Sequence, residues 1–268
     1  MRTYGLLGKS LAHSFSKNYF EKKFANHLPK NLPENLPQDL PQDLVKHLSK
    51  NLEEGYINIE LDSIDNIRDR SEFSGLTGFN VTIPYKQEII QCLDELTPAA
   101  KAIGAVNCVS MENNRWIGHN TDYIGFKRTL LPLIENRVET ALILGTGGAS
   151  LAVAFVLKEL GIRYFFVSRN PQNDQTCSYD QVTPLLLEKC KLIVNTTPVG
   201  QFPHNEEKPD LDYSCLTDQH VLYDLIYNPE RTAFLQEGIS RGARYCNGLS
   251  MLEIQAEESY KIWKGITS

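Results

Sequence analysis

The 268-residue sequence lacks the features that mark several classes of protein. Its six cysteines form no CxxC pair and no Cys/His spacing typical of a metal site, so we expect reduced thiols and no metal. No apolar run approaches the roughly 20 residues that cross a bilayer. Residues 1–7 also lack the basic region followed by an apolar stretch that marks a secretory signal. The net charge of −6 gives no general attraction to nucleic acid or an anionic membrane. We therefore expect a soluble, cytoplasmic protein without nucleic-acid or membrane partners, in which local donors hold any anionic ligand.

One segment has an unusual repeat. Residues 28–51 repeat every four positions as LPKN, LPEN, LPQD, LPQD, LVKH and LSKN. The four prolines remove backbone donors and prevent a continuous helix through the first half. The pattern predicts an extended, solvated insertion whose last part, Leu40–Leu52, can continue as a helix. A docking role for this insertion is the alternative to a tolerated surface expansion.

Apolar periodicity predicts two α/β domains that join near residues 119–124. In the first part, short strands accompany a helix over Ser16–Phe24 with Ser16 as its N-cap, a second helix opening at Lys86–Leu93, and a hairpin across residues 112–114. The second part begins with a helix over Asp122–Ile134. Apolar strands and helical stretches then alternate, the pattern of a parallel sheet with crossovers. The strands predicted there are Ala141–Leu144, Tyr164–Val167, Leu192–Asn195 and Val221–Leu225, and a last helix covers Met251–Trp263.

A glycine-rich turn follows the first strand of the second part. The strand Thr140–Leu144 runs into Gly145-Thr146-Gly147-Gly148-Ala149, and a helical stretch over Leu151–Leu160 comes next. Glycines permit a tight turn and a close approach of the backbone to a pyrophosphate, which lies at the helix N-terminus. Ser150 occupies the third glycine position of the GxGxxG pattern. The placement between a strand and a helix predicts a dinucleotide site; the alternative is a glycine turn without a nucleotide.

The choice of cofactor is read at the end of the next strand. NAD-binding proteins place Asp or Glu there for the ribose hydroxyls, whereas this chain has Ser168, Arg169 and Asn170. An arginine can clamp a 2′-phosphate through two hydrogen bonds. The sequence therefore favours NADP, and a surface arginine in a loop is the competing interpretation.

Four polar clusters in the first 125 residues have the chemistry of a ligand site. Ser14 and Ser16 offer two hydroxyls from one loop, or else form a helix N-cap pair. Lys86 follows a strand that carries Asn80 and Thr82, although most lysines are solvated surface residues. The other two clusters are a small-residue turn that projects Asn107 and the segment 118–125, whose Asp122 either acts chemically or caps a helix.

These residue types suit hydride transfer to or from a hydroxylated carboxylic acid. Oxidation of an alcohol requires a base that removes the hydroxyl proton as the hydride departs, and reduction requires its return. Lys86 can move the proton while Asp122 orients it, without a metal. The sequence does not fix the pKa of Lys86, because burial and a nearby carboxylate shift it in opposite directions.

The sequence resembles the shikimate dehydrogenases along nearly its whole length. Eight motifs carry the resemblance in order: Ser14-Phe-Ser16, Asn80-Val-Thr-Ile-Pro-Tyr-Lys86, Gly104-Ala-Val-Asn107, Asn120-Thr-Asp122-Tyr-Ile-Gly125, Gly145-Thr-Gly-Gly-Ala149, Asn195-Thr-Thr-Pro-Val-Gly200, Asp224-Leu-Ile-Tyr-Asn-Pro229, and Asn247-Gly-Leu-Ser-Met-Leu252 leading to Gln255.

The resemblance implies NADP-linked interconversion of shikimate and 3-dehydroshikimate in aromatic amino-acid biosynthesis. It implies a substrate domain of residues 1–121 plus 248–268, to which the C-terminal helix returns, and a Rossmann-like NADP-binding domain of residues 122–247. The catalytic pair is Lys86 and Asp122. The implied substrate-binding residues are Ser14, Ser16, Asn80, Thr82, Asn107, Tyr227 and Gln255. The implied cofactor-binding residues are Gly145, Thr146, Gly147, Gly148, Ala149, Ser168, Arg169, Asn170, Leu225 and Gly248.

Three positions depart from the family pattern: the insertion at 28–51, the cofactor loop and Gln201. The loop has Ser168 where the family has asparagine, and Asn173 where it has a second arginine. Gln201 stands where the family has methionine. The loop weakens the preference for NADP without supplying the acid that NAD requires. A quinate/shikimate dehydrogenase with relaxed NAD/NADP use and a non-catalytic nucleotide- or shikimate-binding regulator remain alternatives, and the oligomeric state is expected to be monomer or homodimer.

Overall fold

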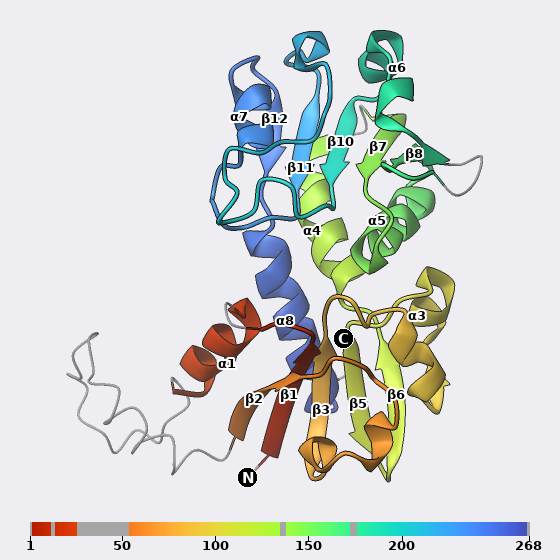
Figure 1. Ribbon diagram of the computed structural model, residues 1–268, viewed down its shortest axis with the longest axis vertical. Coiled ribbons are helices and arrows are strands. Elements are labelled where there is room, and N and C mark those ends of the chain that lie inside the picture. Colours follow the sequence, from red (N-terminus) through yellow and green to blue (C-terminus); the bar gives the residue numbers. More distant parts are fainter. Residues whose placement is uncertain (1, 12–13, 26–53, 135–137, 172–175, 267–268) are drawn as a thin grey trace, which may run out of the picture. The chain divides into compact units, whose positions relative to one another are not determined.

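The computed structural model describes residues 2–11, 14–25, 54–134, 138–171 and 176–266 (Figure 1). The insertion predicted at 28–51 and the helix expected over Leu40–Leu52 lie outside these residues. The chain divides into two compact units. The first comprises Met1–Pro98, Val106–His119 and Ser259–Ser268, and the second comprises Ala99–Ala105 and Asn120–Glu258. Each unit is built on its own six-stranded sheet.

The sheet of the first unit is mixed. Its order is β2 (Glu54–Glu60), β1 (Arg2–Gly8), β3 (Leu76–Val81), β5 (Cys108–Glu112), β6 (Arg115–His119) and β4 (Glu95–Leu96). β1 lies parallel to both β2 and β3, and β3, β5 and β6 are antiparallel neighbours. The hairpin β5–β6 turns at Asn113 and Asn114, both with positive φ, which asparagine tolerates better than most residues.

Helix α1 (Phe15–Ala25) buries Phe20 and Phe24 in the first unit. The ring of Phe20 stacks on Tyr56, with the two centroids 4.5 Å apart. Ser14, just before the helix, accepts a hydrogen bond from the backbone N–H of Lys17 at 3.3 Å. The prediction of Ser16 as the N-cap was therefore wrong, because the helix begins one residue earlier and Ser14 is the capping side chain. The helix predicted at Lys86–Leu93 is instead a turn followed by a 3₁₀ helix, η3 (Glu88–Cys92).

The sheet of the second unit is entirely parallel. Its order is β12 (Arg244–Cys246), β11 (Val221–Asp224), β10 (Leu192–Asn195), β7 (Thr140–Leu144), β8 (Arg163–Val167) and β9 (Thr176–Cys177). Numbered within the unit, this order is 6-5-4-1-2-3, the doubly wound Rossmann arrangement. The strand order reverses between β7 and β10. Ligands of such sheets bind at the carboxyl ends of the strands beside that reversal.

Alternation along the central strand explains why helices cover both faces of this sheet. Ala141 and Ile143 join one apolar cluster with residues of α4 (Asp122–Ile134) and α5 (Gly148–Glu159). Leu142 and Leu144 join a second cluster with residues of α6 (Pro184–Lys189) and α7 (Ala233–Ile239). Successive strand residues point to opposite faces, so a fully apolar strand requires a cover on each side. The α/β, Rossmann-like architecture predicted from the sequence is confirmed.

Two further α-helices lie in the described residues. Helix α3 (Pro98–Ile103) buries Ala100 and Ile103. Helix α8 (Leu249–Trp263) is divided by the two units after Glu258. Within the first unit, Trp263 at its end donates from Nε1 to the carbonyl of Val109 on β5 at 3.0 Å. The Trp263 ring also stacks on Tyr4 with centroids 4.8 Å apart, so the end of α8 packs into the core of the first sheet.

Candidate active site

The glycine turn after β7 is shaped by its neighbours in the second unit. Gly145 has φ +107°, a conformation that residues with a side chain rarely adopt, and its N–H donates to the carbonyl of Val167 at 2.8 Å. A Cβ at Gly145 would lie 2.7 Å from Oγ1 of Thr196. Thr196 in turn donates from Oγ1 to the carbonyl of Leu144 at 2.6 Å. The turn therefore lies directly against the loop that follows β10, at the reversal of strand order.

The next glycine leaves open space at a helix N-terminus. Gly147 is the N-cap of α5, with ordinary extended backbone, and no atom lies within 4 Å of the position a Cβ would take. Ser150, fully buried, donates from Oγ to the carbonyl of Gly147 at 2.6 Å. This bond gives a physical reason for serine at the third glycine position, because it secures the turn from inside. Backbone N–H groups and the helix dipole suit this end of α5 to a pyrophosphate.

The predicted cofactor loop follows β8. Ser168 donates its N–H to the carbonyl of Cys177 at 2.9 Å, and its hydroxyl accepts from the N–H of Asn170 at 3.2 Å. Arg169 between them is exposed. Burial raises the pKa of the Tyr179 phenol, and the positive charge of Arg169 lowers it. The guanidinium of Arg169 therefore lies close enough to this phenol for an electrostatic interaction. The loop thus presents one arginine at the carboxyl edge of the sheet.

The loop after β11 carries the two predicted residues Leu225 and Tyr227. Gly248, after β12, donates its N–H to the carbonyl of Ile226 at 3.0 Å. A Cβ at Gly248 would lie only 2.0 Å from the carbonyl oxygen of Leu225, so no larger residue fits against this loop. The predicted residues of β7, β8, β11 and β12 consequently share one edge of the sheet.

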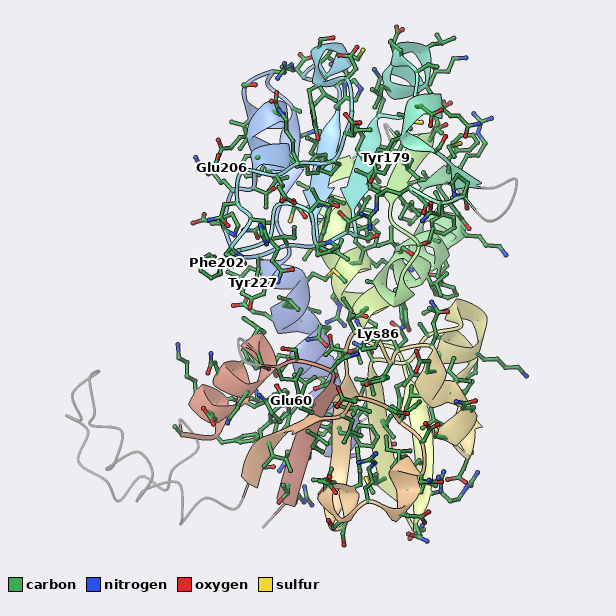
Figure 2. All side chains as sticks on the ribbon, in the orientation of Figure 1. Glu60, Lys86, Tyr179, Phe202, Glu206 and Tyr227 are labelled. Carbon is green, nitrogen blue, oxygen red and sulfur yellow. The ribbon has the colours of Figure 1, made fainter. Side chains whose placement is uncertain are left out.

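In the first unit, the chain around β3 brings four predicted residues together. Asn80, near the end of β3, pairs in register with Cys108 on β5, which follows Asn107 directly. Thr82 donates its N–H to the carbonyl of Leu7, and the turn closes by a bond from Tyr85 N–H to the carbonyl of Thr82 at 3.0 Å. Lys86 is half-buried, and its carbonyl accepts from the N–H of Val106 at 2.7 Å. Figure 2 labels Lys86 on the ribbon of this unit.

The side chain of Asn80 is engaged within the protein. Its Oδ1 accepts from the phenol of Tyr56 at 2.8 Å, and its Nδ2 donates to the carbonyl of Asn107 at 3.1 Å and to Ser259 Oγ at 2.9 Å. Both amide protons are therefore used. The Tyr56 phenol also takes a hydrogen bond from Ser16, and burial raises its pKa well above the usual value. Asn80 therefore links Asn107 directly and Ser16 through Tyr56.

Asp122 and Gln255 belong to the second unit. Asp122 is 5% exposed in the first turn of α4, but Asn120 is the side chain that accepts from a first-turn N–H, that of Tyr123, at 3.2 Å. Asn120 also donates to the carbonyl of Ala105 at 2.9 Å. Gln255 is 6% exposed and accepts from Thr121 Oγ1 at 3.5 Å. Asn120 therefore supplies a side-chain cap for α4, and Asp122 lies buried in its first turn.

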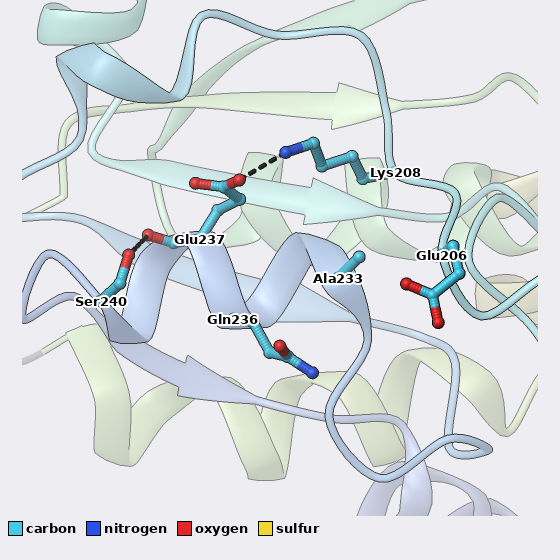
Figure 3. A pocket seen from close by; sticks show the side chains of 6 residues that line it. All are labelled: Glu206, Lys208, Ala233, Gln236, Glu237 and Ser240. Carbon is cyan, nitrogen blue, oxygen red and sulfur yellow. Dashed lines mark hydrogen bonds and ion pairs between the residues drawn. The ribbon is translucent and has the colours of Figure 1, made fainter.

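A groove elsewhere in the second unit contains none of the predicted residues. It has a volume of about 370 Å³ and lies along α7 (Figure 3). Three of its polar side chains are paired, since Lys208 forms an ion pair with Glu237 and Ser240 donates to the carbonyl of Glu237. In the part of the chain that the structure describes, no group of His, Cys, Asp and Glu side chains has the arrangement of a metal site. Among those same residues, no helix combines the length and hydropathy of a membrane span.

Comparison with known proteins identifies what this geometry is similar to. Residues 40–109 match the family model of the shikimate dehydrogenase substrate binding domain. An NADP(+) shikimate dehydrogenase of Caldicellulosiruptor saccharolyticus is 32% identical over 286 aligned positions, which cover 100% of this chain and 94% of the relative.

Solved structures give the same result. Shikimate dehydrogenase 1 of Peptoclostridium difficile superposes with a TM-score of 0.79 at 32% identity, over 100% of this chain and 93% of that one. The shikimate 5-dehydrogenase of Thermus thermophilus, in complex with NADP(H) and shikimate, superposes with a TM-score of 0.76 at 28% identity, over 99% of this chain and 94% of that one.

Proposed function

Because the chain belongs to the shikimate dehydrogenase family, we propose that it catalyses the NADP-dependent, reversible reduction of 3-dehydroshikimate to shikimate. The reaction belongs to aromatic amino-acid biosynthesis. The observation that carries the proposal is the similarity over the full chain to an NADP(+) shikimate dehydrogenase. The strand order of the second sheet, with its reversal between β7 and β10, also suits a nucleotide site. We further propose a cytoplasmic enzyme that acts as a monomer or homodimer without nucleic acid.

The carboxyl edge of the second sheet fits a dinucleotide. The space at Gly147 and the N-terminus of α5 would accept the pyrophosphate, and Arg169 would bind the 2′-phosphate. Bound NADPH supplies a hydride to the substrate carbonyl, and NADP⁺ accepts it in the reverse direction. Leu225 and Gly248 would line the position of the nicotinamide.

Lys86 would move the proton. In shikimate oxidation, the amine of Lys86 would take the proton from the reacting hydroxyl group while the carbon that bears this hydroxyl loses a hydride to NADP⁺. In reduction, the ammonium would return the proton to the same oxygen. Asp122 would accept a hydrogen bond from the substrate hydroxyl and orient the transfer. Its burial in the first turn of α4 supports this role, because a buried carboxylate has little water to compete for its hydrogen bonds.

The remaining polar residues would bind the substrate. Ser14 and Ser16 would hold the carboxylate through their hydroxyls, without a cation. The Ser14 oxygen accepts from Lys17 N–H, which leaves the hydroxyl proton for another acceptor, whereas Ser16 would have to turn from Tyr56. The hydroxyl groups or the ring of the substrate would contact four further residues, Thr82, Asn107, Tyr227 and Gln255. Asn80 would keep Asn107 in place through its hydrogen bond to the Asn107 carbonyl.

An absorbance assay at 340 nm tests the proposal, because only the reduced cofactor absorbs there. The purified protein is mixed with shikimate or quinate and with NADP⁺ or NAD⁺ in all four combinations. We expect reduced cofactor mainly with shikimate and NADP⁺. No reduction with shikimate and either cofactor would refute the proposed activity, and a faster reaction with quinate would identify the alternative substrate.

A further inference from the structure

A buried carboxylate stands at the end of β11. Asp224 is fully buried and accepts three hydrogen bonds. Its Oδ1 accepts from Asn195 Nδ2 at 3.0 Å and from the N–H of Ile226 at 3.1 Å, and its Oδ2 accepts from Thr232 Oγ1 at 2.6 Å. Burial raises the pKa of this carboxyl to about 7, although the three donors act against the rise. A buried carboxylate is costly, so its presence requires a reason.

Each partner of Asp224 belongs to a different segment. Asn195 ends β10, and its Oδ1 accepts from the N–H of Thr197 at 3.0 Å and from the Thr197 hydroxyl at 2.6 Å. Ile226 begins the loop after β11. Thr232 caps α7, because its Oγ1 accepts from the N–H of Leu235 at 3.3 Å. One carboxylate therefore joins the ends of two adjacent strands and the start of a helix.

The loop after β11 is fixed on its other side as well. The carbonyl of Ile226 accepts from Gly248 N–H at 3.0 Å, and the carbonyl of Leu225 lies against the same glycine. Asp224 holds the N–H of Ile226 while Gly248 holds its carbonyl. The peptide groups on both sides of Ile226 are thus set by named bonds, and these decide where Leu225 and Tyr227 point.

We propose that Asp224 is a positioning residue, which sets the loop of residues 225–228 so that Leu225 meets the nicotinamide and Tyr227 meets the substrate. This inference rests on the proposed function for the roles of those two residues. The position of the loop itself rests only on the bonds described. The competing interpretation is that both residues serve folding alone, with Thr232 as the N-cap of α7 and Asp224 as the acceptor that orients the Thr232 hydroxyl.

Two pairs of variants separate these interpretations. Asp224→Asn keeps the size but replaces one acceptor oxygen by a donor, so at least one of the three bonds is lost. Thr232→Val removes the hydroxyl that bonds Asp224 and caps α7, whereas Thr232→Ser keeps both bonds. Thr183→Val is the matched control, because Thr183 caps α6 through the N–H of Leu186 at 3.4 Å and no bond joins it to a carboxylate.

The measurements are kcat, the KM for shikimate and the Kd for NADPH. A displacement of about 1 Å costs on the order of 10²-fold in rate, so we expect Asp224→Asn and Thr232→Val to lower kcat by roughly 10- to 100-fold. The Kd for NADPH should change less than about threefold, because the pyrophosphate and 2′-phosphate sites lie on β7, α5 and β8. Thr232→Ser should restore kcat, and Thr183→Val should leave it unchanged.

Unchanged kcat in both Asp224→Asn and Thr232→Val, with lower thermal stability only, would overturn the proposal. Should Asp224→Asn not fold, Thr232→Val decides, since it retains the carboxylate.

Amide hydrogen exchange tests the same inference without activity. Asp224→Asn should speed exchange in residues 225–228 and leave residues 145–147 unchanged. An inactive wild type would refute the proposed function, and the exchange result would still decide the positioning role.

Discussion

The phenol of Tyr56 donates a hydrogen bond to Oδ1 of Asn80 at 2.8 Å, and both side chains are buried. Tyr56→Phe removes this bond and the acceptor for Ser16, so we expect a loss of about 1–3 kcal/mol in the free energy of unfolding. We also expect the KM for shikimate to rise several-fold with a smaller change in kcat, because Ser16 and Asn107 lose the group that orients them. Urea denaturation and steady-state kinetics measure the two effects.

Tyr213→Phe is the control for this change. Tyr213 is buried in the second unit, and its phenol donates to the carbonyl of Pro209 at 2.6 Å. The same chemical deletion should lower stability there without moving the KM for shikimate. An equal KM for Tyr56→Phe and the wild type would show that Tyr56 has a structural role alone.

Lys86→Ala should abolish most of the proton transfer. Lost general acid–base catalysis lowers kcat by about 10²- to 10⁴-fold, and the KM should change much less. Lys86→Arg should not rescue kcat, because a guanidinium remains protonated at neutral pH. Lys101→Ala, on an exposed helix position, is the control that should retain full activity. A large rise in KM with kcat intact would make Lys86 a binding residue.

Long apolar patterns made much of the fold predictable. Helix α4 spans Asp122–Ile134 and strand β10 spans Leu192–Asn195, both with the bounds expected from the sequence. The strands β4, β9 and β12 were not predicted, because two or three residues are too short to show a period. Such edge strands form because a neighbouring strand offers its backbone groups.

The site was harder to predict where tertiary hydrogen bonds decide the role of a side chain. Asn80 was predicted only as a substrate-binding residue, and the sequence did not show that its amide donates to Asn107 and to Ser259, which lies 179 positions along the chain. Asp224 was noted only as part of a family motif. Its partner Asn195 is 29 positions away on the adjacent strand, and no local pattern predicts that strand order.

Arg169→Ala should discriminate between the two cofactors. Loss of charge-assisted hydrogen bonds to the 2′-phosphate costs about 1.5–3 kcal/mol, which weakens NADP⁺ by roughly 10- to 100-fold and leaves NAD⁺ nearly unchanged. Arg163→Ala is the matched control, because Arg163 is also exposed but begins β8, whereas Arg169 follows its end. Fluorescence titration gives both dissociation constants. Equal losses for NADP⁺ and NAD⁺ would show that Arg169 does not recognise the 2′-phosphate.

Gly147→Ala should separate folding from cofactor binding. The added methyl group meets no atom within 4 Å and the backbone is not left-handed, so the thermal midpoint should fall only slightly. The methyl group would occupy the space through which a pyrophosphate approaches the backbone, and we expect the Kd for NADPH to rise at least about tenfold. Gly147→Ser, which supplies a good N-cap, should keep or increase stability with the same loss of affinity. Normal binding by both variants would place the pyrophosphate elsewhere.

His119 should make the stability of the protein depend on pH below neutrality. Burial lowers its pKa from 6.5 to about 4, and its ring Nε2 lies 3.0 Å from Ser110 Oγ. As the pH falls, His119 therefore binds a proton near pH 6.5 in the unfolded chain but only near pH 4 in the folded chain. This contribution to stability is complete above pH 6.5 and is lost as the pH falls to about 4, by roughly 3 kcal/mol in total. Burial also lowers the pKa of His220, so the wild type has two contributions of the same sign.

His119→Gln can still bond Ser110 but does not titrate. Urea denaturation of this variant at several pH values between 7.5 and 4.5 should show a shallower loss of stability than that of the wild type. A wild-type slope in His119→Gln would mean that His119 takes up its proton equally in the folded and unfolded chains.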